Sequence, residues 1–332
     1  MLLDARDPSD ARTAAAVLQA ARALAGGELV GMPTETVYGL AARADDDAAV
    51  AKIFAAKGRP ADHPLIVHVG DVGSAQVFAA DWPAVAQQLA ARFWPGPLTL
   101  IVPRAPGIAS ASAGGQDSIG LRCPSHPVAQ ALLREAKALG VPGLAAPSAN
   151  RFGRISPTRA AHVVEEFGDA LTVLDGGDCE VGIESSIVDC SRGRPVLLRP
   201  GVLTRQQLEA AAGQPLADRD DAAPRASGTL EAHYAPRAKL RLMPGPMLNT
   251  ALQMLEGSTL KLAVYSRTVP AKAVRGLRHR AMPSQASQAA HELFSALREL
   301  DAEGVHLIWV EEPPADPEWD GVRDRLQRAA AA

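Results

Sequence analysis

The fold is decided by residues 29–69, which read LVGMPTETVYGLAARADDDAAVAKIFAAKGRPADHPLIVHV. Leu29–Met32 is an apolar run and predicts a buried strand. The apolar residues between positions 48 and 54 recur at spacings that suit one face of a helix, which Gly58 ends. Leu65–Val69 is another apolar run and predicts a second strand. Strand, helix and strand in this order indicate an α/β fold.

Hydroxyl, carboxylate and basic side chains stand at the ends of these elements. Thr34, Glu35 and Thr36 follow the first strand, and ligands of open α/β sheets collect where strands end. Lys57 and Arg59 stand in the turn after the helix. Two cations facing threonine hydroxyls suit a polyanion such as a triphosphate, held beside a small polar substrate. Alternatively, the two cations form a solvated helix end that complements the helix macrodipole, which on spacing alone is the commoner arrangement.

Length and composition bound the class of protein. A chain of 332 residues is too long for a typical single core, so we expect two domains. The net charge of −3 gives no overall basic field, so duplex nucleic acid is not an expected partner. Three cysteines without a C-x-x-C spacing argue against a disulfide framework and a thiolate zinc site, and fit a reducing cytoplasm. We find neither a signal peptide nor an apolar window of about 18 residues, so no membrane partner is expected.

Polar residues also stand at the ends of later predicted strands. A strand over residues 118–122 delivers Arg122, which is either an anion ligand or a surface charge, and its position favours a ligand. Ser148 and Asn150 lie in a turn, where they either bond a nucleotide or satisfy the backbone of the turn itself. Arg199 is a further cation at the end of a strand.

Other motifs narrow the chemistry. The sequence contains no Walker A motif, and the small-residue loop at 105–117 either cradles phosphate with its backbone or is a mobile linker. Asp175–Asp178 places two aspartates around two glycines, which suits either a metal or, more typically, a tight turn. Gly182–Ser186 is not a G-x-S-x-G nucleophile elbow, so we discount hydrolase chemistry.

The composition changes after residue 212. Residues 213–237 are rich in Asp, Ala, Pro and Gly and predict a linker that can fold back over the first domain. Within it, Tyr234 either acts as a lid element or only docks the linker. Strands at 239–243, 261–265 and 305–310 alternate with helices near 248–256, 285–303 and 317–331. We therefore predict a domain at 1–212, a linker at 213–237 and a small Rossmann-like domain at 238–332 that lacks a G-x-G-x-x-G motif.

Seven blocks of sequence, in order, resemble the YrdC-like family of threonylcarbamoyl-adenylate synthases. They are PTETVYGL (33–40), KGRP (57–60), PLIVH (64–68), SIGLRCP (118–124), APSAN (146–150), GIESSIVD (182–189) and LLRPG (197–201). HYAP (233–236) resembles the mark of the long form, which has an added C-terminal domain. The resemblance implies a twisted mixed α/β sheet with a deep cationic cleft.

The resemblance also implies an activity. Proteins of this family condense L-threonine, bicarbonate and ATP to threonylcarbamoyl-adenylate and pyrophosphate. Partner proteins then transfer the threonylcarbamoyl group to tRNA, so little direct nucleic-acid binding is expected here. Catalysis would combine positioning with charge neutralisation by Lys57, Arg59, Arg122, Arg199 and Mg²⁺.

Carried over by motif, the residues divide into two sets. Contacts to threonine are implied for Thr34, Thr36, His68, Ser118 and Ser185. Contacts to ATP are implied for Lys57, Arg59, His63, Arg122, Ser148, Asn150, Arg199 and Tyr234. His63 stands where the family frequently has asparagine, and Ser227–Leu230 stands where the family has S-P-G-M. No residue of the chain is assigned to a metal.

Three other readings of the sequence are possible. A carbamoyl-adenylate-forming enzyme of hydrogenase maturation uses a similar domain, but such chains add Cys-rich zinc modules that this sequence lacks. A non-catalytic RNA-binding module would need a basic face and stacked aromatic residues, and aromatic residues make up only 4% of the chain. The C-terminal domain could also serve as a structural or regulatory scaffold.

Overall fold

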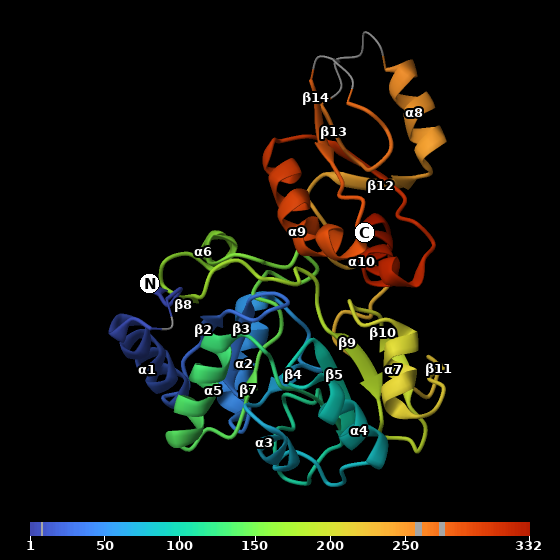
Figure 1. Ribbon diagram of the computed structural model, residues 1–332. Coiled ribbons are helices and arrows are strands. Elements are labelled where there is room, and N and C mark those ends of the chain that lie inside the picture. The colour runs from blue at the N-terminus through green and yellow to red at the C-terminus, as the bar shows by residue number, and fades with distance from the viewer. Residues whose placement is uncertain (8, 256–260, 272–275) are drawn as a thin grey trace. The chain divides into compact units, whose positions relative to one another are not determined.

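The computed structural model describes residues 1–7, 9–255, 261–271 and 276–332 (Figure 1). Contacts between residues divide the chain into two compact units. The first unit is Met1–Phe152 with Ser156–Thr229, and the second unit is Gly153–Ile155 with Leu230–Ala332. In the sequence, the boundary between the two units thus falls near residue 229. The domain and linker boundaries at 212 and 237 stay predictions.

The first unit contains a mixed sheet, which confirms the predicted fold class. Among the described residues it has eleven strands in the order β1-β8-β2-β3-β7-β4-β6-β5-β9-β10-β11. The strands are β1 Leu2–Asp4, β2 Val30–Met32, β3 Gly39–Arg43, β4 Ile66–His68, β5 Leu98–Pro103, β6 Ser118–Arg122, β7 Leu144–Ala145, β8 Thr172–Asp175, β9 Ser186–Asp189, β10 Val196–Arg199 and β11 Ala217–Asp218. Parallel and antiparallel neighbours alternate irregularly across it, as a mixed sheet requires.

The helices of this unit are α1 Ala11–Ala25, α2 Asp47–Lys57, α3 Val72–Gln76, α4 Ala84–Phe93, α5 Pro127–Ala138, α6 Ala160–Phe167 and α7 Arg205–Ala212. Some of them have clear caps. Gly58 ends α2 in the left-handed conformation at φ 65°, which costs glycine little because it has no Cβ. Thr204 and Gln207 form a reciprocal capping box at the start of α7. Local sequence therefore sets the end of α2 and the start of α7.

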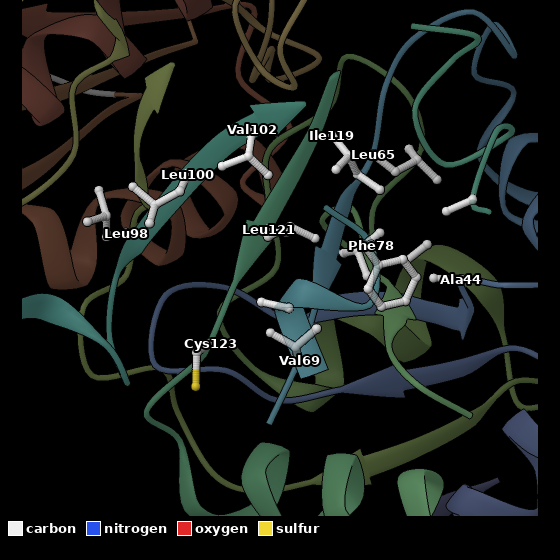
Figure 2. Packing of buried hydrophobic residues seen from close by; sticks show 14 of the residues in the cluster. Ala44, Leu65, Val69, Phe78, Leu98, Leu100, Val102, Ile119, Leu121 and Cys123 are labelled. Carbon is white, nitrogen blue, oxygen red and sulfur yellow. The ribbon is translucent and has the colours of Figure 1, made fainter. Parts of the chain in front are cut away.

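Alternation along the central strands separates a core face from a polar face. Leu98, Leu100 and Val102 of β5 join the buried cluster together with Ile119 and Leu121 of β6 (Figure 2). Because successive side chains of a strand point to opposite faces, the residues between them face the other side of the sheet. These residues include Thr99, Gly120 and Arg122, and also His68 of β4, since Val67 before it lies in the core.

The polar face is covered partly by the chain that follows α7. Ile101, Ile187, Val196 and Leu198 form a small apolar cluster on this face. Ala217, Ala223 and Ala226 pack against that cluster. Residues of the predicted linker, rather than a helix, therefore cover this part of the sheet, and Ser227 of the linker lines a small hollow with Thr99.

Several elements differ from the sequence-based expectations. β1, β3, β11 and α3 were not predicted: β1, β11 and α3 are too short to show a period, and the Ala-rich β3 is buried along most of its length. The loop at 105–117, predicted to be a mobile linker or a phosphate cradle, contains the buried residues Ala109, Ser112 and Ala113. Its backbone also holds Leu65, whose N–H donates to the carbonyl of Ser112 at 2.7 Å.

The second unit contains a small parallel sheet, as predicted. Among the described residues its strands β12 Lys239–Met243, β13 Leu262–Ser266, β14 Leu277–Ala281 and β15 Leu307–Glu311 lie in the order β12-β15-β13-β14. The helices are α8 Gly245–Met254, α9 Ala286–Ala302 and α10 Asp320–Ala330, with a short 3-10 turn η1 at Pro317–Trp319. Strand β14 was not predicted, and the predicted helix end at Glu256 lies outside the described residues. No helix in the described part of the chain is long and apolar enough to cross a membrane.

Candidate active site

The polar face of the sheet brings three side chains of neighbouring strands together. In the strand registers, Arg122 of β6 is the partner of His68 in β4 and of Thr99 in β5. Each of these residues is at most 3% exposed. A buried guanidinium between a histidine and a threonine needs further partners to offset its desolvation. Arg122 is therefore not the surface charge that the sequence left open.

Arg122 finds those partners in the turn after β2. Its Nη1 donates to Oγ1 of Thr36 at 2.7 Å, and its Nη2 lies 2.7 Å from Oε1 of Glu35. The two threonine hydroxyls, of Thr34 and Thr36, lie 2.9 Å apart, and Thr34 donates to the carbonyl of Val37 at 2.6 Å. Hydrogen bonds and one ion pair thus link the hydroxyls, the carboxylate and the guanidinium of this buried group.

Thr36 and Arg122 do not meet at a common edge of the sheet. β2 is antiparallel to β3, β3 to β7 and β7 to β4, whereas β4 and β6 are parallel. The carboxyl ends of β2 and β6 therefore point in opposite directions along the sheet. The expectation that ligand groups meet where strands end is wrong for this pair, and Thr36 and Arg122 meet because the long arginine side chain reaches the turn.

His68 is a neutral histidine within this group. Burial, together with the nearby charge of Arg122, lowers the pKa of His68 to about 3. Its Nδ1 has no hydrogen-bond partner among the described residues. A buried ring nitrogen without a partner is costly unless a ligand satisfies it. His68 is thus suited to bond a polar group of a bound molecule.

A second group of residues is built around Arg199. Its Nε and Nη2 donate to the carbonyl of Ser185 at 3.1 and 2.9 Å, and its Nη1 donates to the carbonyl of Ser227 at 2.8 Å. Oγ of Ser185 lies 2.8 Å from Oγ1 of Thr99, which links this group to Arg122. Arg59 donates from Nη2 to the carbonyl of Pro64 at 3.0 Å and lies 3.5 Å from Oγ of Ser227. Ser227 therefore joins two of the predicted cations.

Lys57 is held by the turn that carries Ser148 and Asn150. Its Nζ donates to the backbone carbonyl of Ser148 at 2.6 Å and to that of Asn150. Burial and the neighbouring Arg59 lower the pKa of Lys57 well below its ordinary value. Lys57 and Arg59 are 3% and 8% exposed, so the alternative of a solvated helix end is wrong.

Two further predicted residues lie beside these groups. Ser118 lines a small hollow together with Thr99, Gly120 and Ser227. His63 packs on the ring of Phe152, with ring centroids 5.4 Å apart. The guanidinium carbon of Arg59 lies 5.6 Å from the centroid of that same ring. Burial, followed by the charge of Arg59, lowers the pKa of His63.

Tyr234 is the one predicted residue that lies in the second unit. It is 1% exposed, and its ring packs against Phe294 with centroids 5.4 Å apart. The guanidinium carbon of Arg325 lies 5.6 Å from the ring centroid. All other predicted site residues lie in the first unit, where hydrogen bonds, strand pairs, the hollow and the contacts of Arg59 connect them.

Sequence reasoning missed Thr99 and Ser227. Thr99 is a lone polar residue in the apolar run LTLIV, which was a weak signal that one face of this strand is polar. Its contact with Ser185 depends on strand register, which local sequence does not reveal. Ser227 lies in the predicted linker, and nothing in its neighbours points to Arg59 or Arg199.

The acidic turn and the cysteines are structural. Tyr38 donates its hydroxyl to the carbonyl of Gly177 at 2.7 Å, and Asp175 accepts the N–H of Gly177 at 3.0 Å. This is the tight turn that the sequence left open beside a metal site. No group of three or more His, Cys, Asp or Glu among the described residues could hold a metal ion. The three cysteines are free and buried, and burial raises the pKa of Cys123 to about 11.

Comparisons with known proteins agree with this fold. A family model for Sua5, YciO and YrdC proteins, described as telomere recombination, matches residues 22–201, and one described as the threonylcarbamoyl-AMP synthase C-terminal domain matches residues 203–331. Threonylcarbamoyl-AMP synthase of Bacillus subtilis is 38% identical over 95% of this chain and 92% of its own length. The enzyme of that name from Pyrococcus abyssi is 37% identical over 92% of this chain and 91% of its own length.

A solved structure extends the likeness to three dimensions. It is the crystal structure of P. abyssi Sua5 complexed with L-threonine, which is 33% identical to this chain. The two superpose with a TM-score of 0.90 over 99% of this chain and 97% of the other. The resemblance seen in the sequence motifs is confirmed by these matches. The chain therefore belongs to the Sua5/YciO/YrdC family, in the long form that carries the Sua5 C-terminal domain.

Proposed function

We propose that this chain is a threonylcarbamoyl-AMP synthase, which condenses L-threonine, bicarbonate and ATP to threonylcarbamoyl-AMP and pyrophosphate. The observation that carries the proposal is the linked set of buried cations and hydroxyls in the first unit. Arg122, Thr36 and His68 form a buried polar group suited to a small zwitterion. Lys57, Arg59 and Arg199 lie along the same linked set and suit a triphosphate.

The relatives support the same assignment. Two proteins named threonylcarbamoyl-AMP synthase match nearly the whole chain, and the matching solved structure has L-threonine bound. We assign threonine contacts to Thr34, Thr36, His68, Ser118 and Ser185. We assign ATP contacts to Lys57, Arg59, His63, Arg122, Ser148, Asn150, Arg199 and Tyr234.

The chemistry starts at the amine of threonine, which must be neutral to attack CO₂ or bicarbonate. The nitrogen forms a bond to carbon and loses a proton. With CO₂ the electrons of one C–O π bond move to oxygen, and with bicarbonate a C–O bond breaks and the hydroxide leaves as water with that proton; either route gives a carbamate. An oxygen of the carbamate then attacks the α-phosphorus of ATP, and the bond from that phosphorus to the β-phosphate oxygen breaks as pyrophosphate leaves. His68 is neutral at physiological pH and can hydrogen-bond the amino acid without adding charge.

The protein contributes positioning and charge neutralisation. No covalent enzyme intermediate is needed, so the absence of a nucleophile elbow from the sequence is no obstacle. Lys57, Arg59 and Arg199 are oriented by carbonyl groups, so they need little reorganisation when negative charge develops on the phosphates. A bound triphosphate favours the charged form of Lys57 and opposes the lowering of its pKa by burial.

Magnesium is proposed to arrive with the nucleotide rather than to occupy a site made by the chain. The one carboxylate in the Arg122 group, that of Glu35, is already paired with the guanidinium. Mg²⁺ is commonly held by substrate phosphates, where it neutralises their charge. Bicarbonate as the carbon source, transfer of the product to tRNA by partner proteins, and a cytoplasmic location consistent with three free thiols belong to the same proposal.

The test is pyrophosphate release from ATP, measured with and without L-threonine and bicarbonate. Release that requires both compounds supports the proposal, and mass spectrometry should then detect threonylcarbamoyl-AMP. Release that needs carbamoyl phosphate instead of threonine would select the carbamoyl-adenylate activity. Retention of RNA without turnover would select a binding module.

A further inference from the structure

A short segment from the middle of the chain, Gly153–Ile155, belongs to the second unit. Ala235 donates its N–H to the carbonyl of Gly153 at 2.8 Å, and Ala235 forms a parallel bridge with Arg154. Arg298 of α9 donates a side-chain hydrogen bond to the carbonyl of Ile155. We call the two segments Gly153–Ile155 and Ala235–Ala238 together the clasp.

One buried carboxylate holds both segments of the clasp. Asp301 lies in α9, and its side chain is 6% exposed. Its Oδ1 accepts the N–H of Ala238 at 2.8 Å, and its Oδ2 lies 3.3 Å from Nε of Arg237. The same Oδ2 lies 3.7 Å from Nη2 of Arg154. The two bonds to Ala238 and Arg237 are charge-assisted hydrogen bonds, which are directional. The contact with Arg154 is a longer ion pair, and through it the same carboxylate links the two segments.

Both segments continue directly into residues that the proposed function assigns to ATP. Ser148 and Asn150 lie shortly before Gly153, and in between Phe152 donates its N–H to the carbonyl of Lys57 at 2.9 Å. Tyr234 immediately precedes Ala235 and has a φ of 63°. This left-handed conformation is unfavourable for a residue with a Cβ and persists only where the surroundings impose it.

We propose that Asp301 is a positioning residue for the nucleotide. By holding the clasp it fixes the backbone from which Ser148, Asn150 and Tyr234 project. This inference rests on the proposed function, and it gives the second unit a part in nucleotide binding although its sequence lacks a dinucleotide motif. Small displacements of binding groups lower affinity and rate strongly, so loss of the clasp should weaken ATP more than threonine.

The test uses Asp301→Asn in the full-length chain. Asparagine keeps the size and the acceptor for Ala238 but removes the charge that pairs with Arg154 and Arg237. The KM for ATP in pyrophosphate release, and the Kd for ATP from calorimetry, are each expected to rise roughly tenfold. The KM for threonine is expected to change less than about twofold.

A second variant identifies the route of the effect. Arg154→Gln alters the same ion pair at a side chain that is 34% exposed, so it provides the test if Asp301→Asn does not fold. If Asp301 acts through Arg154, the double variant should show a Kd for ATP close to that of the weaker-binding single variant. Additive losses of affinity would contradict the pairing.

The matched control is Glu292→Gln on the same helix. Glu292 accepts the hydroxyl of Tyr265 at 3.0 Å and pairs with Arg280, and it takes no part in the clasp. If Asp301 has a merely structural role, Asp301→Asn should behave like Glu292→Gln. Each variant would then have a lower unfolding midpoint and an unchanged KM and Kd for ATP, and this outcome would overturn the proposal. Failure of the proposed function would look different, since the wild type would then release no pyrophosphate while the Kd comparison could still be made.

Discussion

Two buried carboxylates, Glu35 in the first unit and Glu311 in the second, lie at or just after the end of a strand and have different partners. Glu35 pairs with Arg122, whose other guanidinium nitrogen donates to the hydroxyl of Thr36. Glu311 accepts the backbone N–H groups of Arg267 and Thr268 at 2.6 and 2.7 Å. The carboxylate of Glu35 orients the guanidinium of Arg122, and the carboxylate of Glu311 accepts hydrogen bonds from backbone N–H groups.

The difference indicates where ligands can bind. In open parallel sheets, ligands normally occupy the strand ends, where backbone N–H groups attract anions. In the second unit the side chain of Glu311 fills such a position as an internal anion. The site of the first unit instead lies on a sheet face, where His68 keeps an unsatisfied nitrogen. We therefore expect the substrate chemistry in the first unit and, apart from the ATP contact assigned to Tyr234, structural or positioning roles in the second.

The largest effect is expected for Lys57→Ala. Removal of one preorganised cation from the proposed phosphate site should lower turnover by roughly a few hundredfold, the usual order for a lost transition-state contact. Pyrophosphate release under saturating substrates measures it, with circular dichroism as a check on folding. Near-normal release by the variant would remove Lys57 from the mechanism.

Glu311→Gln should affect stability but not substrate binding. Loss of the charged acceptor weakens the bonds from Arg267 and Thr268, which is expected to cost about 2 kcal/mol in the free energy of unfolding. Bonds from Thr268 and the backbone outweigh burial and lower the pKa of Glu311. The stabilisation from these bonds is therefore fully present above the ordinary carboxyl pKa. It is lost as the pH falls through the lowered pKa of Glu311. Urea titrations should show this difference, and a changed KM for threonine or ATP would contradict the comparison.

A pH titration of the free energy of unfolding should detect that His68 is held neutral in the folded chain. The pKa of His68 is about 3 in the folded chain and is ordinarily about 6.5, so below pH 6.5 the unfolded chain binds a proton that the folded chain does not. Stability therefore falls as pH decreases through this window. Between pH 7 and pH 5, the wild type should lose about 2 kcal/mol more than His68→Gln. Equal losses in urea titrations would show that His68 is not held neutral.

The smallest effect is expected for Thr99→Val, which keeps the shape of the side chain and removes its hydroxyl. Oγ of Ser185 then loses a partner at 2.8 Å. If Ser185 contacts threonine, the KM for threonine should rise roughly fivefold, the equivalent of about 1 kcal/mol for one hydrogen bond. Thr250→Val on α8 is a control, since that hydroxyl donates to the carbonyl of Pro246 in its own helix. An unchanged KM for threonine in Thr99→Val would indicate that Ser185 does not contact the amino acid.

Much of the fold followed from local patterns. The terminator Gly58 placed the end of α2 correctly. The apolar runs Leu29–Met32 and Leu65–Val69 indicated the strands β2 and β4, and the motif blocks led to the family. The short strand β1 and the Ala-rich β3 escaped because their three to five residues show no period that distinguishes them from a loop or a helix.

The sequence by itself determined the family, the α/β class of both sheets and most of the side chains in the candidate site, because these depend on local motifs and on residue type. Only the tertiary structure decided which of those side chains meet. The register that sets Thr99 beside Arg122, and the fold that carries Ser227 to Arg59 and Arg199, depend on packing summed over many distant residues. No short stretch of sequence contains the information on packing between residues that are far apart in the chain.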